Sequence, residues 1–496
     1  MTRRVGLTDL FASCGLFLLG LVIRALPVPT MLLGRDGATF FGNDAYYHVR
    51  RIWYSVVHFP EVLQRDPYMN FPEGGQPIWT PTFDWLIAAT VRLGLGLPEQ
   101  EVMEAWIIWV PPVLGALTVV ALYFLALRYF SRTVAVVSGL LLALLPAHFW
   151  YSQLGFIDHH VAVALVTTGL LAATMSVLSH EPGAGAWRRA LCLGTAFAAS
   201  LWVWPGCLLF VVVAEIGLSV RLISSDRREM AVGWGRLFVL ANALAFLFVL
   251  PLGLGSEWER WGRFSPLVFS EFQPLMFGLA ALGFLALSEF WQRIAYPARR
   301  LDRVLQAAFA AGVLIGLTLT VLPVLSEGLG AGWSWLAKGE NFQAGVGESK
   351  PLFRGGGRRA EEFFTRAIYL APLVLVVFWG RMRRRADRAA CFFLVGWSAA
   401  LAAAALMQIR FSNSFSVAWS LLLAWSLVEI VSRTRAQLSS RAGVRWIALA
   451  AGVLVLLFVV TPSVMSYRAY AFNIVRSSRG EPPRNNYLER LQAVRE

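Results

Sequence analysis

Repeated apolar segments of about 20 residues constrain this chain more than any other feature. About 20 apolar residues cross the hydrocarbon core of a bilayer as a helix, and in lipid only helices and closed barrels satisfy their backbone hydrogen bonds. The pattern therefore predicts an all-α polytopic membrane protein. It contains thirteen such segments, near residues 8–27, 104–127, 133–150, 157–179, 188–203, 205–222, 234–253, 274–292, 304–325, 366–380, 388–408, 413–431 and 444–463.

The charge distribution agrees with a membrane protein. Only 15% of the residues are charged, against roughly 25% in soluble proteins. The net charge of +14 comes almost wholly from arginines in short runs between apolar segments. Nucleic-acid binding would need basic residues clustered on a soluble face, so we expect no nucleic-acid partner. The opening "MTRR" is followed by no small-residue cleavage site, which favours a retained first span over a signal peptide.

The basic loops predict the orientation of the chain. A further apolar stretch, 82–96, is short and contains Asp84 and Arg92. If it does not cross and the N-terminus is cytoplasmic, basic loops such as "QRIAYPARRLDR" and "GRMRRRADR" all face the cytoplasm, as the positive-inside rule requires. A first outer loop (28–103) and a late outer loop (326–365) then share the other face. The glycine-rich late loop is either an active-site cover or a connector.

Candidate functional residues gather on this predicted outer face. Carboxylates and an imidazole at a membrane edge are costly unless paired or functional, and together they suit Mn²⁺ or Mg²⁺ better than a thiolate zinc site. An arginine nearby would bind phosphate in a bidentate manner. The candidates are Asp44 in "GNDAYYHVRR", Asp158, His159 and His160 in "GFIDHH", Glu348 in "VGESKP" and Arg410 in "QIRFSNS".

Each candidate also has a structural interpretation that the sequence leaves open. An aspartate before a helix, such as Asp158, is often an N-cap. Asp44 could pair with Arg50 or Arg51. Glu348 lies in a glycine-rich loop, and Arg410 could be an interfacial arginine whose charge reaches water.

Several other polar or reactive residues are interpreted as structural. His58 and His148 are expected at loop edges, and no role is assigned to His48. The tryptophans of "WVWPG" (202–206) are expected to anchor helix ends at the interface. The four cysteines, which show no metal-ligand spacing, are interpreted as packing residues: Cys14, Cys192, Cys207 and Cys391.

The order and wording of the motifs resemble the catalytic subunit of oligosaccharyltransferase, the STT3/AglB/PglB family with the GT-C fold. The motifs are "GNDAYYHVRRI", "FPEGGQPIWTPTFDWLIA", "GFIDHHVAV", "GESKPLF" after a glycine-rich loop, and "RF". The resemblance covers roughly residues 8–463. It implies a GT-C transmembrane catalytic domain over 1–463, followed by a short outer tail over 464–496.

The resemblance also implies roles for the candidates. Asp44 and Asp158 would be metal ligands, and His160 would replace the second acid of the family's second motif. Asp44 and Glu348 would contact the acceptor, although the family's Ser or Thr three residues before that glutamate is Gly345 here. In the same comparison, Arg410 and His159 would face the lipid-linked phosphates.

The implied function is metal-dependent transfer of a glycan from a polyprenyl-diphosphate carrier to protein asparagine, on the outer face of the plasma (inner) membrane. The family's WWDYG motif, which reads the acceptor sequon, does not occur in this chain. Two explanations stay open: a separate acceptor-reading subunit, or another acceptor. Alternative functions are a transferase using a polyprenyl-monophosphate sugar, a lipid-linked-sugar flippase or transporter, and an inactive subunit that binds donor lipid or a partner.

Overall fold

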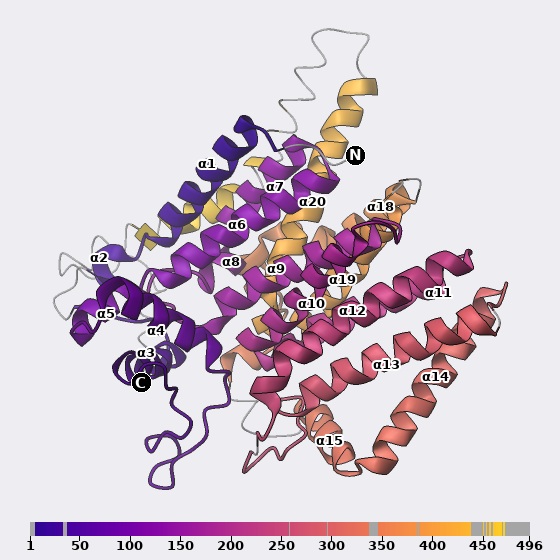
Figure 1. Cartoon of the computed structure of the whole chain (residues 1–496). Coiled ribbons are helices and arrows are strands. Elements are labelled where there is room, and N and C mark those ends of the chain that lie inside the picture. Colours follow the sequence, from indigo (N-terminus) through magenta and orange to yellow (C-terminus); the bar gives the residue numbers. More distant parts are fainter. Residues whose placement is uncertain are drawn as a thin grey trace.

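The structure, a computed structural model, is a bundle of long helices (Figure 1). In the part of the chain that it describes, the regular elements are helices, and the only β-pairing is an isolated bridge between Asp66 and Gly75. The predicted all-α class is therefore confirmed. The structure describes all residues except 1–4, 33–36, 257, 295, 337–345, 384, 386, 438–449, 451–452, 454–455, 458–459, 469 and 472–496.

Nine helical segments among the described residues are long and apolar enough to cross a membrane. In this count α5 (Gln100–Ile107) and α6 (Val110–Tyr129) form one segment. The others are α1 (Leu7–Arg24), α9 (His159–Leu178), α11 (Leu208–Ile223) with η1 (Pro205–Cys207), α12 (Arg228–Gly253), α13 (Phe272–Arg293), α14 (Arg300–Val321), α19 (Arg388–Met407), and α20 (Ser412–Gln437) with η4 (Ile409–Phe411).

The remaining predicted spans have more complex shapes. The segment 133–150 is divided at Pro146 into α7 (Arg132–Leu144) and α8 (Pro146–Trp150). The segment 188–203 is α10 (Ala186–Val203), whose two opening arginines lower its hydropathy. The segment 366–380 belongs to α18 (Ala371–Met382) and η3 (Arg366–Leu370), bent by 97° from α17 (Arg358–Phe364). The segment 444–463 lies largely outside the described residues, so a total of thirteen spans stays a prediction.

Both predicted outer loops contain helices. The first holds α2 (Val28–Met31), α3 (Asn43–Val57) and α4 (Thr82–Leu95). The 14 residues of α4 rise about 21 Å, less than the roughly 30 Å of a hydrocarbon core, which fits the prediction that 82–96 does not cross. The late loop is less irregular than its glycines indicated, because α15 (Val324–Leu336), η2 (Gly347–Ser349) and α17 lie within or across its ends.

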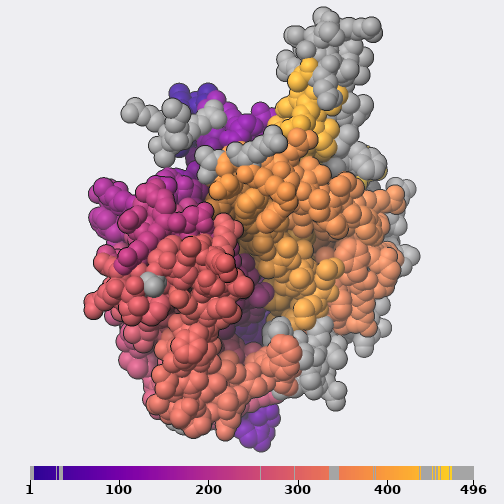
Figure 2. Space-filling model, turned by 90° about the vertical axis from the view of Figure 1, so that its right-hand side faces the viewer, coloured from indigo at the N-terminus to yellow at the C-terminus, as the bar shows by residue number. Residues whose placement is uncertain are grey.

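Helix α9 lies at the centre of the bundle and is flanked by α6, α10, α19 and α20 (Figure 1). Most of the α9 surface is apolar, because other helices surround much of it, although Gly169 is exposed. At the edge of the bundle, α14 packs mainly on α13 and buries little of itself. In side view a groove separates the red segment containing α13 and α14 from the orange segment containing α18 and α19 (Figure 2).

The cysteines only partly follow the packing interpretation. All four are free; Cys207 and Cys391 are buried, whereas Cys14 and Cys192 are exposed on the surface of the bundle. The prediction was therefore wrong for Cys14 and Cys192. An apolar helix surface that faces lipid has the same composition as one that faces another helix, so hydropathy does not separate the two environments.

The contact between α10 and α12 gives a test of the packing. A Cβ atom added to the buried Gly194 would lie 2.4 Å from the carbonyl oxygen of Ala241, so Gly194→Ala should force the two helices apart. We expect destabilisation by about 1–3 kcal/mol, measured as a lower thermal unfolding midpoint in detergent. Gly169→Ala is the control, since a Cβ at this exposed α9 position meets nothing within 4 Å. Equal midpoints for the two variants would contradict the packing.

Candidate metal and phosphate site

The candidate site is built around the first turn of α9. Asp158 is the N-cap residue, and its Oδ1 accepts a hydrogen bond of 3.3 Å from the backbone N–H of His160. The preceding chain is fixed where the backbone N–H of Phe41 donates to the carbonyl of Gly155 at 2.8 Å. Gly155 has a φ of +83°, a conformation that favours glycine. The capping role of Asp158 is thus real, and its second oxygen and remaining lone pairs stay available.

The late loop brings Glu348 to this turn. The Nε2 atom of His160 lies 3.0 Å from Oε2 of Glu348, although the two residues are 188 positions apart. Asp158, His160 and Glu348 each offer one ligand atom, and these atoms all lie within 4.8 Å of one another. Both α9 residues are buried, while 28% of the Glu348 side chain is exposed. The structure therefore brings Asp158, His160 and Glu348 together.

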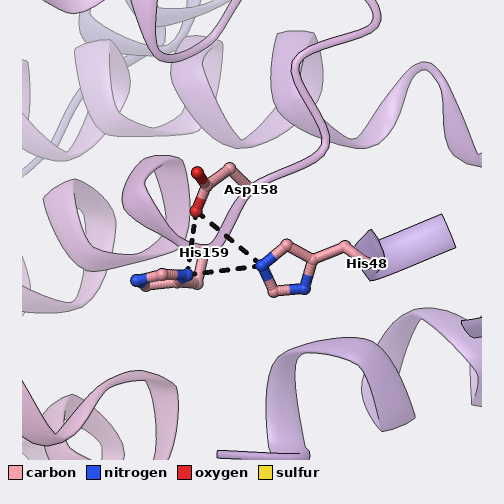
Figure 3. Close-up of side chains that lie close together, drawn as sticks. All are labelled: His48, Asp158 and His159. Carbon is pink, nitrogen blue, oxygen red and sulfur yellow. Dashed lines mark hydrogen bonds and ion pairs between the residues drawn. The ribbon is translucent and has the colours of Figure 1, made fainter. Parts of the chain in front are cut away.

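A second group shares Asp158 (Figure 3). Its Oδ1 lies 2.8 Å from Nδ1 of His159 and 3.9 Å from Nε2 of His48. The two imidazoles lie 3.4 Å apart, between the same nitrogen atoms. His48, Asp158 and His159 form the other set of described residues whose ligand atoms could hold a metal ion. Sequence reasoning assigned no role to His48, although it lies in the same motif as Asp44.

Behind His48 lies a buried ion-pair network that the sequence did not predict. Oδ1 of Asp84 accepts from Nδ1 of His48 at 2.6 Å, and its Oδ2 lies 3.0 Å from the Arg51 guanidinium. Arg51 also donates to the carbonyl of Trp79 at 3.3 Å. Asp84 thereby directs Nε2 of His48 toward Asp158. The sequence signal for this network is Asp84 itself, the acid in the "FDW" of the second motif.

Asp44 lies at the start of α3 and belongs to neither three-residue group. Its predicted pairing with Arg50 or Arg51 is wrong: Arg50 binds Asp66 at 2.9 Å, and Arg51 binds Asp84. Desolvation, followed by the negative charges of Asp158 and Glu348, raises the pKa of Asp44. Asp44 is thus electrostatically coupled to the site, and it is the most exposed carboxylate there, ahead of Glu348.

Arg410 lies where α19 gives way to α20, and it contacts the same loop as Glu348. Its guanidinium donates to Oγ of Ser349 at 2.8 Å, and the backbone N–H of Ile409 donates to the carbonyl of Lys350 at 2.9 Å. These bonds hold η2 against η4, so that a cation and a carboxylate border the same turn. Arg410 is therefore part of the site's wall, which an isolated interfacial arginine would not be.

Two residues expected at helix or loop edges instead support the site. His148 is fully buried, where it bonds Oδ1 of Asn413 at 2.7 Å, and Asn413 donates to the carbonyl of His160 at 2.9 Å. Trp204, expected as an interfacial anchor, has its ring 5.6 Å and 5.8 Å from the rings of His159 and His160. The prediction for His148 was wrong because tertiary packing, which local sequence does not contain, decides its position. Trp204 does lie at the junction of α10 and η1, as expected, and its role as an interfacial anchor stays a prediction. His58 is exposed at the end of α3, as expected.

Pairing with histidines lowers the pKa of two carboxyl groups of the site, those of Asp158 and Glu348. Burial opposes ionisation of Asp158, but the imidazoles of His160, His159 and His48 outweigh it and hold the pKa of Asp158 well below its usual range. His160 likewise holds the pKa of Glu348 below its ordinary value despite burial. Burial disfavours the charged form of His48, yet the Asp84 carboxylate prevails and raises the pKa of His48.

This arrangement fits a divalent cation. Two carboxylate oxygens and one imidazole nitrogen within 4.8 Å are donors that Mn²⁺, Mg²⁺ and Zn²⁺ accept. In addition, Nε2 of His159 is buried and has no hydrogen-bond partner among the described residues. A buried polar atom without a partner is costly and marks a position for a ligand atom. The site can therefore hold a cation and an anionic group side by side.

Comparison with known proteins gives one family. Residues 37–467 match the family described as oligosaccharyl transferase STT3, N-terminal. The chain is similar to the dolichyl-monophosphooligosaccharide–protein glycotransferase AglB of Haloferax volcanii, with 27% identity over 326 residues, covering 60% of this chain and 30% of that protein. It thus spans about a third of the length of this curated relative.

Solved structures share the fold. The archaeal oligosaccharyltransferase AglB from Archaeoglobus fulgidus, in complex with an inhibitory peptide and a dolichol-phosphate, superposes with a TM-score of 0.77 at 18% identity, covering 94% of this chain and 56% of that chain. A structure of the Archaeoglobus fulgidus oligosaccharyltransferase in complex with Zn and sulfate has a TM-score of 0.68 at 18% identity, covering 92% of this chain and 53% of that chain.

The Asn413 network gives a stability test. Asn413→Ala would leave the buried Nδ1 of His148 without its partner and remove the side-chain bond to the His160 carbonyl, and a buried unsatisfied group costs about 1–3 kcal/mol. We expect a lower thermal unfolding midpoint than for Gln64→Ala, which alters an exposed amide in the first outer loop. If the two variants unfold together, Asn413 does not support the turn.

Proposed function

We propose, since the chain belongs to the STT3 family of oligosaccharyl transferases, that it transfers a glycan from a polyprenyl-diphosphate carrier to a protein acceptor, an asparagine side chain. The observation that carries the proposal is the meeting of Asp158, His160 and Glu348 at one end of the central helix, with Arg410 on the adjoining turn. A transporter would instead place its ionisable residues near the bilayer midplane, whereas these groups lie at a helix start and in the segments between spans.

A divalent cation, Mn²⁺ or Mg²⁺, would be held by Asp158, His160 and Glu348, with Asp44 as a further carboxylate of the site. When bound, such an ion stabilises negative charge on a departing phosphate group. The hydrogen bond between His160 and Glu348 holds these two ligands together and keeps the late loop against α9. Asp84 holds the His48 ring, so that Nε2 of His48 faces Asp158.

The phosphates of the donor would lie between Arg410 and His159. The guanidinium of Arg410 is fixed by Ser349, so its remaining N–H groups are oriented before the donor arrives. Bidentate arginine–phosphate contacts are stronger than contacts between neutral groups. The unpartnered Nε2 of His159 would complete the set by a hydrogen bond to a phosphate oxygen. Trp204, which packs on both histidines, excludes water behind them.

The acceptor amide would be held by Asp44 and Glu348. An asparagine amide nitrogen is a poor nucleophile because its lone pair is delocalised into the carbonyl. Two carboxylates that accept hydrogen bonds from its N–H groups orient the nitrogen toward the anomeric carbon. This positioning raises the effective concentration of the nucleophile. Both residues are the more exposed acids of the site, as contact with an incoming polypeptide requires.

The outer face of the membrane is the proposed location. The site lies at the N-terminal end of α9, whereas arginine-rich segments such as 221–228 and 381–388 border the opposite helix ends. Basic loops remain in the cytoplasm, so the site would face outward, on the plasma membrane.

A second candidate donor carries one phosphate. The Haloferax volcanii relative is named for a dolichyl-monophospho donor. The acceptor is likewise open between an asparagine sequon read by a separate subunit and another protein group. The transferase core and its ligands are common to these candidates.

Metal dependence follows from the proposed ligands. With purified protein, lipid-linked glycan and cell-envelope proteins, a chelator should abolish transfer, and Mn²⁺ or Mg²⁺ should restore it. Asp158→Asn should lower turnover by about 100-fold or more, because stabilisation of the leaving group by a cation is worth several kcal/mol. Asp302→Asn, an exposed carboxylate on α14, is the control. Unchanged transfer by Asp158→Asn, with and without chelator, would refute the metal site.

A variant of Arg410 tests whether this residue binds the donor phosphate. Arg410→Lys keeps the charge but loses the bidentate geometry, so KM for the preferred donor should rise about tenfold or more while the KM for the acceptor stays constant. Parallel assays with diphosphate-linked and monophosphate-linked glycan identify the donor. A change confined to the acceptor KM would show that Arg410 does not bind phosphate.

A further inference from the structure

A second cavity lies among α11, α14, α18 and α19. Its volume is about 740 Å³, within the range of pockets that hold small molecules. Most of its lining comes from α11 and α19, with single residues from the end of α9 and the start of α14. Two of its apolar lining residues, Ile216 and Val220, are more than half exposed, so the cavity is open at the side of the bundle that faces lipid.

The lining combines four arginines with an apolar wall. The apolar part includes Val213, Phe392, Phe393 and Trp397, and no aspartate or glutamate is among the described residues that line the cavity. One end of the cavity is therefore strongly positive and the rest is suited to hydrocarbon. The arginines are Arg221, Arg300, Arg383 and Arg388.

Three of these arginines form no ion pair with the described residues. In the described part of the chain, no hydrogen bond or ion pair joins the side chain of Arg300, Arg383 or Arg388 to another residue. The nearby Asp387 is bound in a bidentate manner by Arg385, with both distances 2.7 Å.

Arg221 is the most buried of the four. Its guanidinium lies 3.7 Å from the centre of the Trp234 ring, and its Nε is buried without a hydrogen-bond partner among the described residues. Glu181, which is outside the lining, is the acid whose charge acts on it. The side chain is thus held in place by the ring, while its hydrogen-bonding capacity is left for a ligand.

The cavity lies on the membrane face opposite the candidate site. Leu178, which ends α9, lines the cavity, whereas His159, which begins α9, lies in the site. The 20 residues between these ends rise about 30 Å. Helix α19 runs the other way, from Arg388 in the cavity to Met407, three residues before Arg410. The two places are therefore separate, and each is connected to the other by two packed helices.

We propose that this cavity binds an anionic glycerophospholipid of the leaflet opposite the candidate site. The phosphate would lie among the four arginines, and an acyl chain would follow the wall formed by α11 and α19. A free phosphate ion would leave the apolar wall uncovered, and a zwitterionic lipid would leave the positive charge uncompensated. This proposal does not depend on the proposed transferase activity.

Native mass spectrometry of the full chain in detergent tests the proposal, with phosphatidylglycerol and phosphatidylcholine of the same acyl chains as probes. We expect wild-type protein to bind phosphatidylglycerol about tenfold more tightly than phosphatidylcholine, since each arginine near a lipid surface adds to the attraction for anionic headgroups. The double variant Arg383→Gln/Arg388→Gln should lose this preference. The matching double variant Arg383→Lys/Arg388→Lys should retain most of it.

The control double variant, Arg227→Gln/Arg228→Gln, removes the same charge from exposed residues at the start of α12, outside the cavity. Preserved preference in this control, with loss in the cavity variant, supports the site. Equal loss in both variants would show that general surface charge attracts the lipid and would overturn the proposal. The proposal also fails if wild type shows no preference, or if polyprenyl phosphate displaces phosphatidylglycerol from the wild type.

Discussion

The Asp158 carboxylate is the group on which the arrangement of the site depends. It caps the helix at the centre of the bundle and lies within reach of His159, His160 and His48. A buried carboxylate is unfavourable unless it is paired, so the three imidazoles must converge on it. That requirement ties the first outer loop to α9 through His48, and His160 in turn ties the late loop to α9 through Glu348.

The parts of the structure that local sequence determines were predicted well. A run of 20 apolar residues has few options in a membrane, so the helical class and most helix positions followed directly. Asp158 and His160 were grouped correctly because the motif resemblance supplied contacts that spacing alone does not. Their third partner is Glu348, however, whereas Asp44, predicted as the third metal ligand, lies outside this group. The sequence did not identify Asp84 as a site residue. Its role depends on contacts with Arg51 and His48, which lie on a separate helix, α3.

Where prediction failed, packing decided the outcome. His148 follows a helix break, which in sequence is typical of an exposed edge. In the folded bundle this break points inward, and His148 bonds Asn413 beside the site. The glycines of the late loop suggested an irregular segment, yet α15 forms there, with Gly332 close against Pro266. Glycine lowers helix propensity but also allows close packing between helices, and the second effect prevails at this position.

The replacement of a second motif acid by His160 has an electrostatic consequence. Asp158 and Glu348 carry two negative charges, and a neutral imidazole adds none, so a divalent cation in the proposed site would be balanced by these ligands. A carboxylate at position 160, added to Asp158, Glu348 and the nearby Asp44, would place a further negative charge beside the donor phosphates and repel them. With His160, no further negative charge competes with the phosphates for Arg410. The histidine variant therefore suits a site in which one arginine and one imidazole bind the leaving group.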